Sequence, residues 1–284
     1  MRLSLLLPYR VQIRLGRALG WLPYWLLPRR RMVALRNIET CFPELDEAAH
    51  LSMVKEHFKS LGASAVEMAL GWWASDKKLA RLMTLEGAEH VTKALAGGKG
   101  AILLSAHFTT MECSGRTLAK HIGPFRAMYR PGRNALVNEM LKRGRERSAA
   151  AVIAKDDVRT MLKTLKANTP VWYAADQAYV RKGSALVPFF SVPAMTNVAT
   201  SRIARVSGAP VLPYLPLRLP GGRGYLLTVL PPLENFPSED PIADAAAFNR
   251  IIEDHIRKDP SQYFWVHRKF KSRPDPYPDI YENP

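Results

Sequence analysis

Residues 101–120, AILLSAHFTTMECSGRTLAK, set the class of fold. Residues 101–105 are a short apolar run, and they follow a glycine pair at Gly97 and Gly98 that interrupts the preceding pattern. The residues from Thr109 to Lys120 then have the composition and spacing of a helix. The segment is therefore expected to form a strand, a loop and a helix, in that order.

The same order recurs along the chain. Between Glu47 and Ala74, apolar residues recur at alternating spacings of three and four, which predicts a long helix. Further strand-like runs occupy 152–154, 171–175, 210–217 and 225–230, and further helices are expected at 157–167, near 196–206 and at 243–257. The charge-free run 183–201 contains Pro188 and Pro193, so we expect a loop and the start of a helix there. This alternation predicts an α/β fold with a largely parallel central sheet flanked by helices.

Composition limits the class of protein and of partner. The chain has 284 residues, of which 47% are hydrophobic, which is enough for one large domain and excludes a disordered chain. The 41 basic and 25 acidic residues give a net charge of +16, which favours an anionic partner: nucleic acid, an acidic protein or an anionic membrane. The two cysteines, Cys41 and Cys113, are too few for a disulfide framework or a zinc cluster and favour a reducing compartment.

The N-terminus is both basic and apolar. Residues 1–38 contain eight arginines and no acidic residue. Arg10, Arg14 and Arg17 share one face of a predicted helix, whereas Val11, Leu15, Ala18 and Leu22 fall on another. The charge-free run from Ala18 to Pro28 has 11 residues, whereas a membrane-spanning helix needs about 20. We therefore expect residues 1–28 to be a membrane-associating amphipathic segment ahead of a single domain at 29–284; the alternative is a soluble helix packed on that domain.

A histidine and a glutamate lie five residues apart at the predicted strand-to-helix junction. On one continuous helix, His107 and Glu112 would point about 140° apart, so they can meet only if His107 lies in the loop and Glu112 in the first helical turn. In that arrangement the carboxylate would orient the imidazole, and the other ring nitrogen could take a proton from an alcohol. The alternative for Glu112 is a capping box with Thr109, which requires no chemistry.

Several separated stretches of the sequence have the pattern of a known family. Residues 107–112 match the H-x-x-x-x-(D/E) motif of glycerolipid-type acyltransferases. Further blocks that agree in order are 36–38, 41–44 (CFPE), 129–131 (YRP), 176–177 (DQ), 188–190 (PFF) and 262–274 (QYFWVHRKFKSRP). On these blocks the chain resembles the lipid A biosynthesis lauroyl/myristoyl acyltransferase family. One departure is that members commonly carry an additional apolar N-terminal helix, which this sequence does not clearly show.

The resemblance implies an activity and a place for it. It implies an O-acyltransferase that moves a fatty acyl group from acyl carrier protein to a hydroxyl of a lipid A precursor, at the cytoplasmic face of the bacterial inner membrane. His107 would be the general base and Glu112 its support, and neither a metal nor a redox cofactor is implied. Runner-up functions are an acyltransferase for another membrane lipid, such as a phosphatidylinositol mannoside or an ornithine lipid, and a non-catalytic lipid-binding protein.

Further residues are expected to bind substrates. Arg130 matches a block that carries a phosphate- or headgroup-binding arginine, and Asp176 and Gln177 match the Asp-Gln block at the end of a strand. A solvated Arg130 and a structural Asp176 are the alternatives. Candidates for contact with the carrier protein or with lipid phosphates are Arg143, Arg145, Arg147, Arg268 and Lys269. We do not expect a nucleic-acid partner, because no such motif is recognisable and the N-terminal arginines are interleaved with Leu and Trp.

Overall fold

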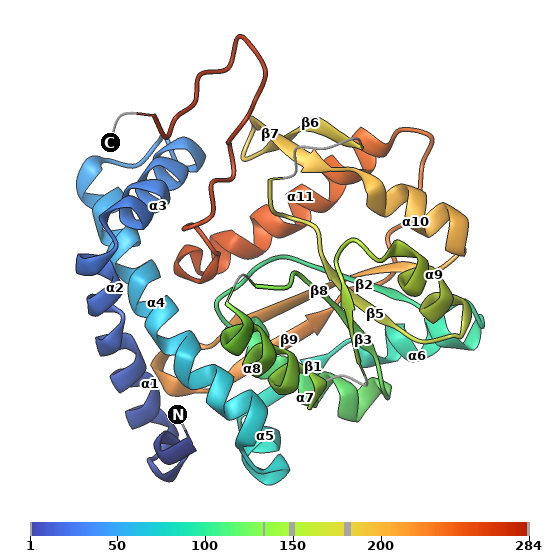
Figure 1. The fold of residues 1–284 in the computed structure, drawn as a ribbon, viewed down its shortest axis with the longest axis horizontal. Coiled ribbons are helices and arrows are strands. Elements are labelled where there is room, and N and C mark those ends of the chain that lie inside the picture. Colours follow the sequence, from blue (N-terminus) through green and yellow to red (C-terminus); the bar gives the residue numbers. More distant parts are fainter. Residues whose placement is uncertain (1, 133, 148–150, 179–182, 283–284) are drawn as a thin grey trace.

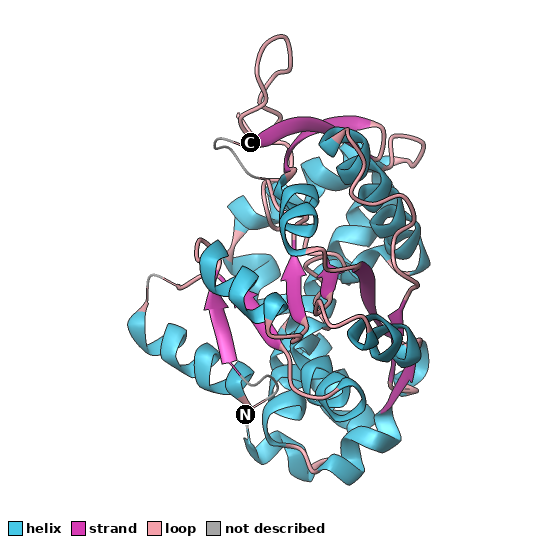
Figure 2. Cartoon of the chain, turned by 90° about the vertical axis from the view of Figure 1, so that its right-hand side faces the viewer, coloured by secondary structure: helices cyan, strands magenta, loops and turns pink. Residues whose placement is uncertain are grey.

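The computed structural model describes residues 2–132, 134–147, 151–178 and 183–282. A seven-stranded sheet forms the centre, with helices on both of its faces (Figure 1, Figure 2). Its strands lie in the order β1 (Met83–Glu86), β9 (Tyr225–Val229), β8 (Val211–Arg218), β2 (Ile102–Ser105), β5 (Val171–Ala174), β3 (Arg126–Tyr129) and β4 (Ala151–Ala154). Neighbouring strands are parallel except for the antiparallel pair β8 and β9. The predicted α/β fold with a largely parallel sheet is confirmed.

Side chains of the central strand β2 pack into hydrophobic cores on both faces of the sheet. Ile102 and Leu104 belong to a core shared with α9 (Val158–Lys166), α10 (Ala199–Ser207) and α11 (Pro241–Lys258). Leu103 belongs to a second core, shared with α6 (Ala88–Ala96) and α7 (Met111–Ile122). Successive side chains of a strand point to opposite faces, so a strand covered on both sides is apolar throughout.

The long helix α4 (Glu47–Trp73) confirms the prediction from its apolar spacing. It begins after Asp46, whose side chain accepts a hydrogen bond from the Ala49 amide at 2.7 Å. The N-terminal helices α1 (Tyr9–Leu19), α2 (Trp21–Leu26) and α3 (Pro28–Cys41) pack along α4, after a short 3-10 turn, η1 (Arg2–Leu6). The α1 and α4 backbones touch, because a Cβ atom at Gly62 would lie 2.2 Å from the Gly16 carbonyl oxygen. The expected N-terminal helical segment is therefore present, and the division at residue 28 stays a prediction.

Residues 183–201 differ from the expected loop. They form a hairpin of β6 (Ser184–Phe189) and β7 (Val192–Asn197), and α10 starts only at Ala199. Pro188 and Pro193 face each other across this two-stranded sheet. A proline lacks the amide proton of a sheet ladder, which is tolerated on edge strands, and both strands of this hairpin are edges. The prolines therefore did not mark a loop.

The remaining elements are short. They are α5 (Asp76–Leu82), α8 (Ala135–Glu146), and the 3-10 turns η2 (Pro220–Gly222) and η3 (Pro260–Gln262). The helices predicted at 157–167 and 243–257 are present as α9 and α11, each preceded by an aspartate whose side chain caps the first turn.

Candidate active site

Two side chains meet beyond the carboxyl ends of neighbouring strands at the middle of the sheet. His107 lies two residues after β2 and Asp176 two residues after β5. The two strands are parallel, with Ser105 aligned to Ala174. Loops at the carboxyl edge of a parallel sheet converge there, and this edge is where open α/β folds place their ligand sites.

The imidazole of His107 is bonded to the Asp176 carboxylate. Nδ1 lies 2.6 Å from Oδ1, with the His107 side chain 28% exposed and that of Asp176 2% exposed. An ionised carboxylate can only accept, so Nδ1 donates and Nε2 keeps a lone pair. Burial alone would raise the pKa of the Asp176 carboxyl, but His107 and Lys269 outweigh burial and hold that pKa well below its usual value. The carboxylate is therefore charged at neutral pH and can stabilise a protonated imidazole.

A C-terminal segment holds both partners in place. The Tyr263 hydroxyl donates to Asp176 Oδ2 at 3.0 Å, and Lys269 Nζ donates to the Asp176 backbone oxygen at 2.5 Å. The Phe264 amide donates to the His107 oxygen at 3.0 Å, which fixes the backbone of the histidine loop. Burial lowers the pKa of Lys269 to about 8, opposed by the nearby Asp176 carboxylate. Residues 263–269 thus orient Asp176 and His107 together.

Glu112 is not the carboxylate at His107. As expected, His107 lies in the loop and Glu112 in the first turn of α7. However, the Glu112 side chain binds Arg145 of α8, with Nε 3.0 Å from Oε1 and 3.3 Å from Oε2, and with a further contact from Nη2. The expected Glu112 bond to the imidazole is wrong, because the neighbouring strand β5 delivers Asp176 to Nδ1 instead. A part of Glu112 in the reaction stays a prediction.

The alternative capping box at α7 is also not formed. The residue that caps α7 is Thr110, without a side-chain hydrogen bond to the helix. The Thr109 hydroxyl instead lies 2.8 Å from the Ser60 hydroxyl of α4. Arg218, at the end of β8, donates to Ser60 Oγ at 2.9 Å and forms a buried ion pair with Glu67. This buried pair therefore supports the histidine loop through Ser60 and Thr109. The sequence gives two signs of the pair: Glu67 lies inside an apolar helix, and Arg218 lies at the end of an apolar strand.

Two of the predicted substrate-binding residues lie near the histidine. Asp176 and Gln177 line a small hollow with His107. Arg130 follows β3 and is exposed, with no hydrogen bond or ion pair within the described residues. Since β3 neighbours β5 in the same orientation, Arg130 lies at the same edge of the sheet. A headgroup or phosphate contact for Arg130 and Gln177 stays a prediction.

The five predicted carrier-protein or phosphate contacts separate into two groups. Arg143, Arg147 and Arg268 are exposed, and contact with a partner stays a prediction for them. Lys269 is only 2% exposed and is bound to Asp176, so the prediction of a contact with a carrier protein or a lipid phosphate is wrong. Arg145 is held by Glu112 with 22% of its side chain exposed, which leaves little of it for a protein surface.

No cysteine in the described structure is placed to be a nucleophile. Cys41 and Cys113 are both buried. Cys113 lies in the first turn of α7, is fully buried, and its thiol donates to the Thr110 oxygen at 2.9 Å. Burial raises the pKa of the Cys113 thiol well above its usual value, so the reactive thiolate is disfavoured. The described residues also contain no group of three or more His, Cys, Asp or Glu side chains that could hold a metal ion.

Comparisons with known proteins agree over nearly the whole chain. Residues 1–272 match the family model of bacterial lipid A biosynthesis acyltransferases. The chain is 38% identical over 276 residues to a lipid A biosynthesis lauroyltransferase of Escherichia coli K12, covering 97% of this chain and 90% of that protein. It is 37% identical over 272 residues to a lipid A biosynthesis palmitoleoyltransferase of the same strain, covering 94% and 87%. It is 34% identical over 286 residues to a lipid A biosynthesis acyltransferase of Haemophilus influenzae, covering 99% and 91%.

Proposed function

Because the chain belongs to the bacterial lipid A biosynthesis acyltransferase family, we propose that it transfers a fatty acyl group from acyl carrier protein to a hydroxyl of a lipid A precursor. The observation that carries the mechanism is the hydrogen bond between His107 Nδ1 and the buried Asp176 carboxylate. That bond orients the ring, and Nε2 is then the free basic atom of the pair.

The proposed reaction is direct transfer with His107 as general base. Nε2 takes the proton of the acceptor hydroxyl while its oxygen attacks the thioester carbonyl of the donor. A carbon–oxygen ester bond forms, the carbon–sulfur bond breaks, and the departing thiolate takes the proton from the imidazolium. Asp176 keeps its negative charge throughout and stabilises the imidazolium, as its lowered pKa requires. The burial of Cys113 favours this route over an acyl-cysteine intermediate.

We place the acyl chain at a small apolar hollow of about 50 Å³ beside α7, which would have to widen to hold the chain. It extends from Met111 and Glu112 to Phe125, Trp172 and Tyr214. Large apolar side chains form most of its wall, and the ion-paired Glu112 and Arg145 also line it. We therefore expect substitutions in this wall to change the preferred length of the donor chain.

The N-terminal helices carry the proposed contact with the cytoplasmic face of the inner membrane. None of the described helices is both long and apolar enough to cross a bilayer. Large apolar side chains are nevertheless exposed along η1, α1 and α2: Leu6, Leu7, Val11, Leu15, Leu19, Trp21, Leu22, Trp25, Leu26 and Leu27. Such a surface with arginines beside it is typical of a helix that lies in a membrane interface.

The test is an assay with purified protein, an acyl carrier protein loaded with a fatty acid, and a lipid A precursor. The acceptor should gain the mass of one acyl chain, and the carrier should be released as the free thiol. His107→Ala should abolish transfer, whereas His121→Ala, on the exposed end of α7, should not. Full activity of a folded His107→Ala variant, or transfer only to another class of membrane lipid, would refute the proposal.

A further inference from the structure

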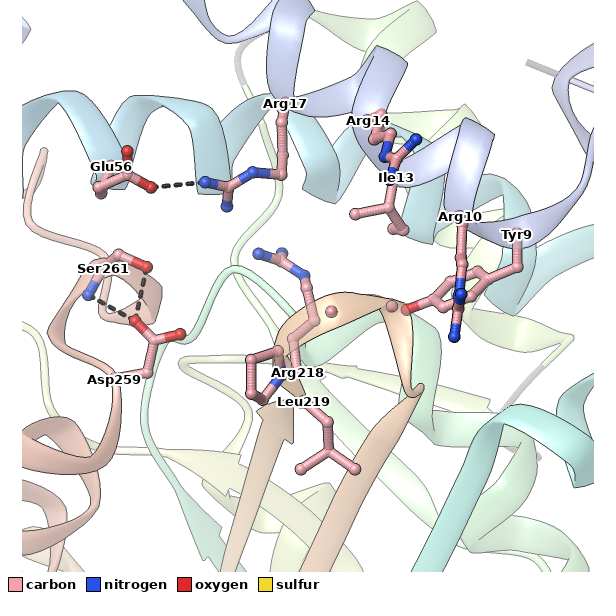
Figure 3. Close-up of a pocket in the computed structure, with 13 residues that line it drawn as sticks. Tyr9, Arg10, Ile13, Arg14, Arg17, Glu56, Arg218, Leu219, Asp259 and Ser261 are labelled. Carbon is pink, nitrogen blue, oxygen red and sulfur yellow. Dashed lines mark hydrogen bonds and ion pairs between the residues drawn. The ribbon is translucent and has the colours of Figure 1, made fainter.

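A cavity of about 470 Å³ lies between α1 and the turn that joins β8 to β9 (Figure 3). Arg10, Arg14 and Arg17 of α1 form one wall, and the turn at 219–222 forms another. Its volume is in the range of sites for small ligands and far exceeds that of a single water. His107 is not among the residues that line it, so the cavity is separate from the candidate active site.

The cavity has more positive than negative charge. Within the part of the chain that the structure describes, Arg10 and Arg14 have no ion pair and no hydrogen bond, and both are exposed. Arg17 is paired with Glu56, and that carboxylate also accepts from Lys59. Two guanidinium groups therefore remain without a negative partner.

The other charged groups of the cavity are already matched. Arg218 is bound to the Glu67 carboxylate behind the wall. The Asp259 carboxylate accepts three hydrogen bonds, from the Ser261 amide at 3.1 Å, from the Ser261 hydroxyl at 2.7 Å and from Gln262 Nε2 at 2.6 Å. Asp259 thus has its own donors, and it does not neutralise the arginines of α1.

The turn is shaped to hold Arg10 over the cavity. Gly222 has φ of +69°, and a Cβ atom there would lie 2.8 Å from Arg10 Cγ. A larger residue would be strained by this backbone conformation and would also displace the arginine stem. Arg10 therefore lies against the turn, with its guanidinium at the cavity (Figure 3).

The arginine wall of the cavity lies next to an exposed apolar surface on the same helix. Val11, Leu15 and Leu19 follow one another at four-residue spacing along α1 and are exposed. An arginine wall beside such a stripe matches an amphiphile, in which an anionic group is covalently linked to hydrocarbon. A soluble anion would use the arginines alone and leave the stripe uncovered.

We propose that this cavity binds the phosphate group of an anionic membrane lipid, with the hydrocarbon of that lipid along the apolar stripe of α1. The planar guanidinium groups of Arg10 and Arg14 suit paired hydrogen bonds to phosphate oxygens. This proposal rests on the proposed membrane contact of the N-terminal helices. It adds that the contact recognises one headgroup chemistry, a phosphate, in addition to the general attraction of arginines to an anionic membrane.

The experiment compares two charge-matched double variants of the full chain. Arg10→Gln/Arg14→Gln removes the unpaired cavity arginines, and Arg29→Gln/Lys55→Gln removes two exposed cations outside the cavity. Partitioning is measured by co-sedimentation with phosphatidylcholine vesicles that contain phosphatidylglycerol. A second set of vesicles has the same charge density from cholesteryl hemisuccinate, whose anionic group is a carboxylate. All four substituted residues are exposed, so the folded state should be retained, and circular dichroism checks it.

The cavity variant should lose about tenfold more partitioning to phosphatidylglycerol vesicles than the control variant, and the difference should be much smaller on hemisuccinate vesicles. Equal losses in both variants would show attraction by net charge alone and would overturn the site. Inorganic phosphate tests whether the ligand is a soluble anion instead of a lipid. Phosphate could raise the melting temperature of the wild-type protein but not that of the Arg10→Gln/Arg14→Gln variant, while both partition equally to vesicles. That result would show that the cavity binds a soluble phosphate and not a lipid.

The same preparations separate this site from the proposed function. Acyl transfer is measured with acceptor dispersed in detergent, where membrane attachment is not required. Arginine-dependent partitioning without any acyl transfer would refute the proposed function and leave the lipid site in place. Normal acyl transfer, together with equal partitioning losses in the cavity variant and the control variant, would support the proposed function and refute the lipid site.

Discussion

Replacing Asp176 with asparagine tests the proposed partner of His107. The change removes one charge from a 2% exposed position and leaves a side chain of nearly the same size. The imidazole then loses a charge-assisted hydrogen bond of 2.6 Å to a buried carboxylate. General-base catalysis typically contributes 10²- to 10⁴-fold, so we expect kcat to fall by about that factor, or about 3–5 kcal/mol of barrier. The KM values should change little, because the carboxylate is buried behind the imidazole.

A double-mutant cycle shows whether His107 and Asp176 act as one unit. If Asp176 works only through the imidazole, Asp176→Asn should add little to the loss already caused by His107→Ala. Asp244→Asn is the matched control, because Asp244 is a buried carboxylate that accepts from the Ser238 amide at the start of α11. Near-wild-type kcat in a folded Asp176→Asn variant, or losses that simply multiply in the double variant, would show that Asp176 does not act through His107.

Glu112, Cys113 and Lys269 can each be tested by substitution. Glu112→Gln and Arg145→Gln should lower kcat/KM by similar factors, because the two side chains form one ion pair. The double variant should lose no more than either single variant, and losses that multiply would contradict this. Cys113→Ser should retain transfer, and mass spectrometry should find no acyl group on the wild-type thiol, whose pKa is raised by burial. Burial lowers the pKa of Lys269, so between pH 8 and pH 10.5 the folded protein binds fewer protons at Lys269 than the unfolded chain does. The free energy of unfolding should therefore rise with pH over this range, by up to about 3 kcal/mol relative to the Lys269→Met variant. Parallel pH dependences in denaturant titrations of the two proteins would show that Lys269 does not titrate there.

The predictable part of the fold was encoded in local patterns. The 3-4 spacing of apolar residues between Glu47 and Ala74 is a property of one helix, and α4 has nearly those bounds. The apolar run at 101–105 was recognisable because β2 is covered on both faces. The hairpin of β6 and β7 was not recognisable from the sequence. A strand can contain Pro188 only if the edge that lacks the amide proton is unpaired, and the local sequence does not show which edge is paired.

The residues of the site were easier to predict than their pairing. The sequence identifies both as candidates: His107 from its motif, and Asp176 from its place after a strand and from the Asp-Gln block of the family resemblance. Their contact depends on strand order: β3 follows β2 in sequence, yet β5 lies between them in the sheet. The sequence favours Glu112 because it is close to His107 in the chain, whereas Asp176 is 69 residues away from His107. The burial of Lys269 likewise arises from the packing of the C-terminal segment over the histidine loop, which composition does not show.

Mass spectrometry of lipid A shows whether the protein transfers an acyl chain in cells. The samples come from cells that make this protein, cells that lack it, and cells complemented with wild-type or His107→Ala protein. Lipid A from the deleted cells should lack one fatty acyl chain, which the wild-type protein should restore and His107→Ala should not. Lipid A of unchanged mass after deletion would refute the transfer, and full restoration by His107→Ala would refute the catalytic role of His107.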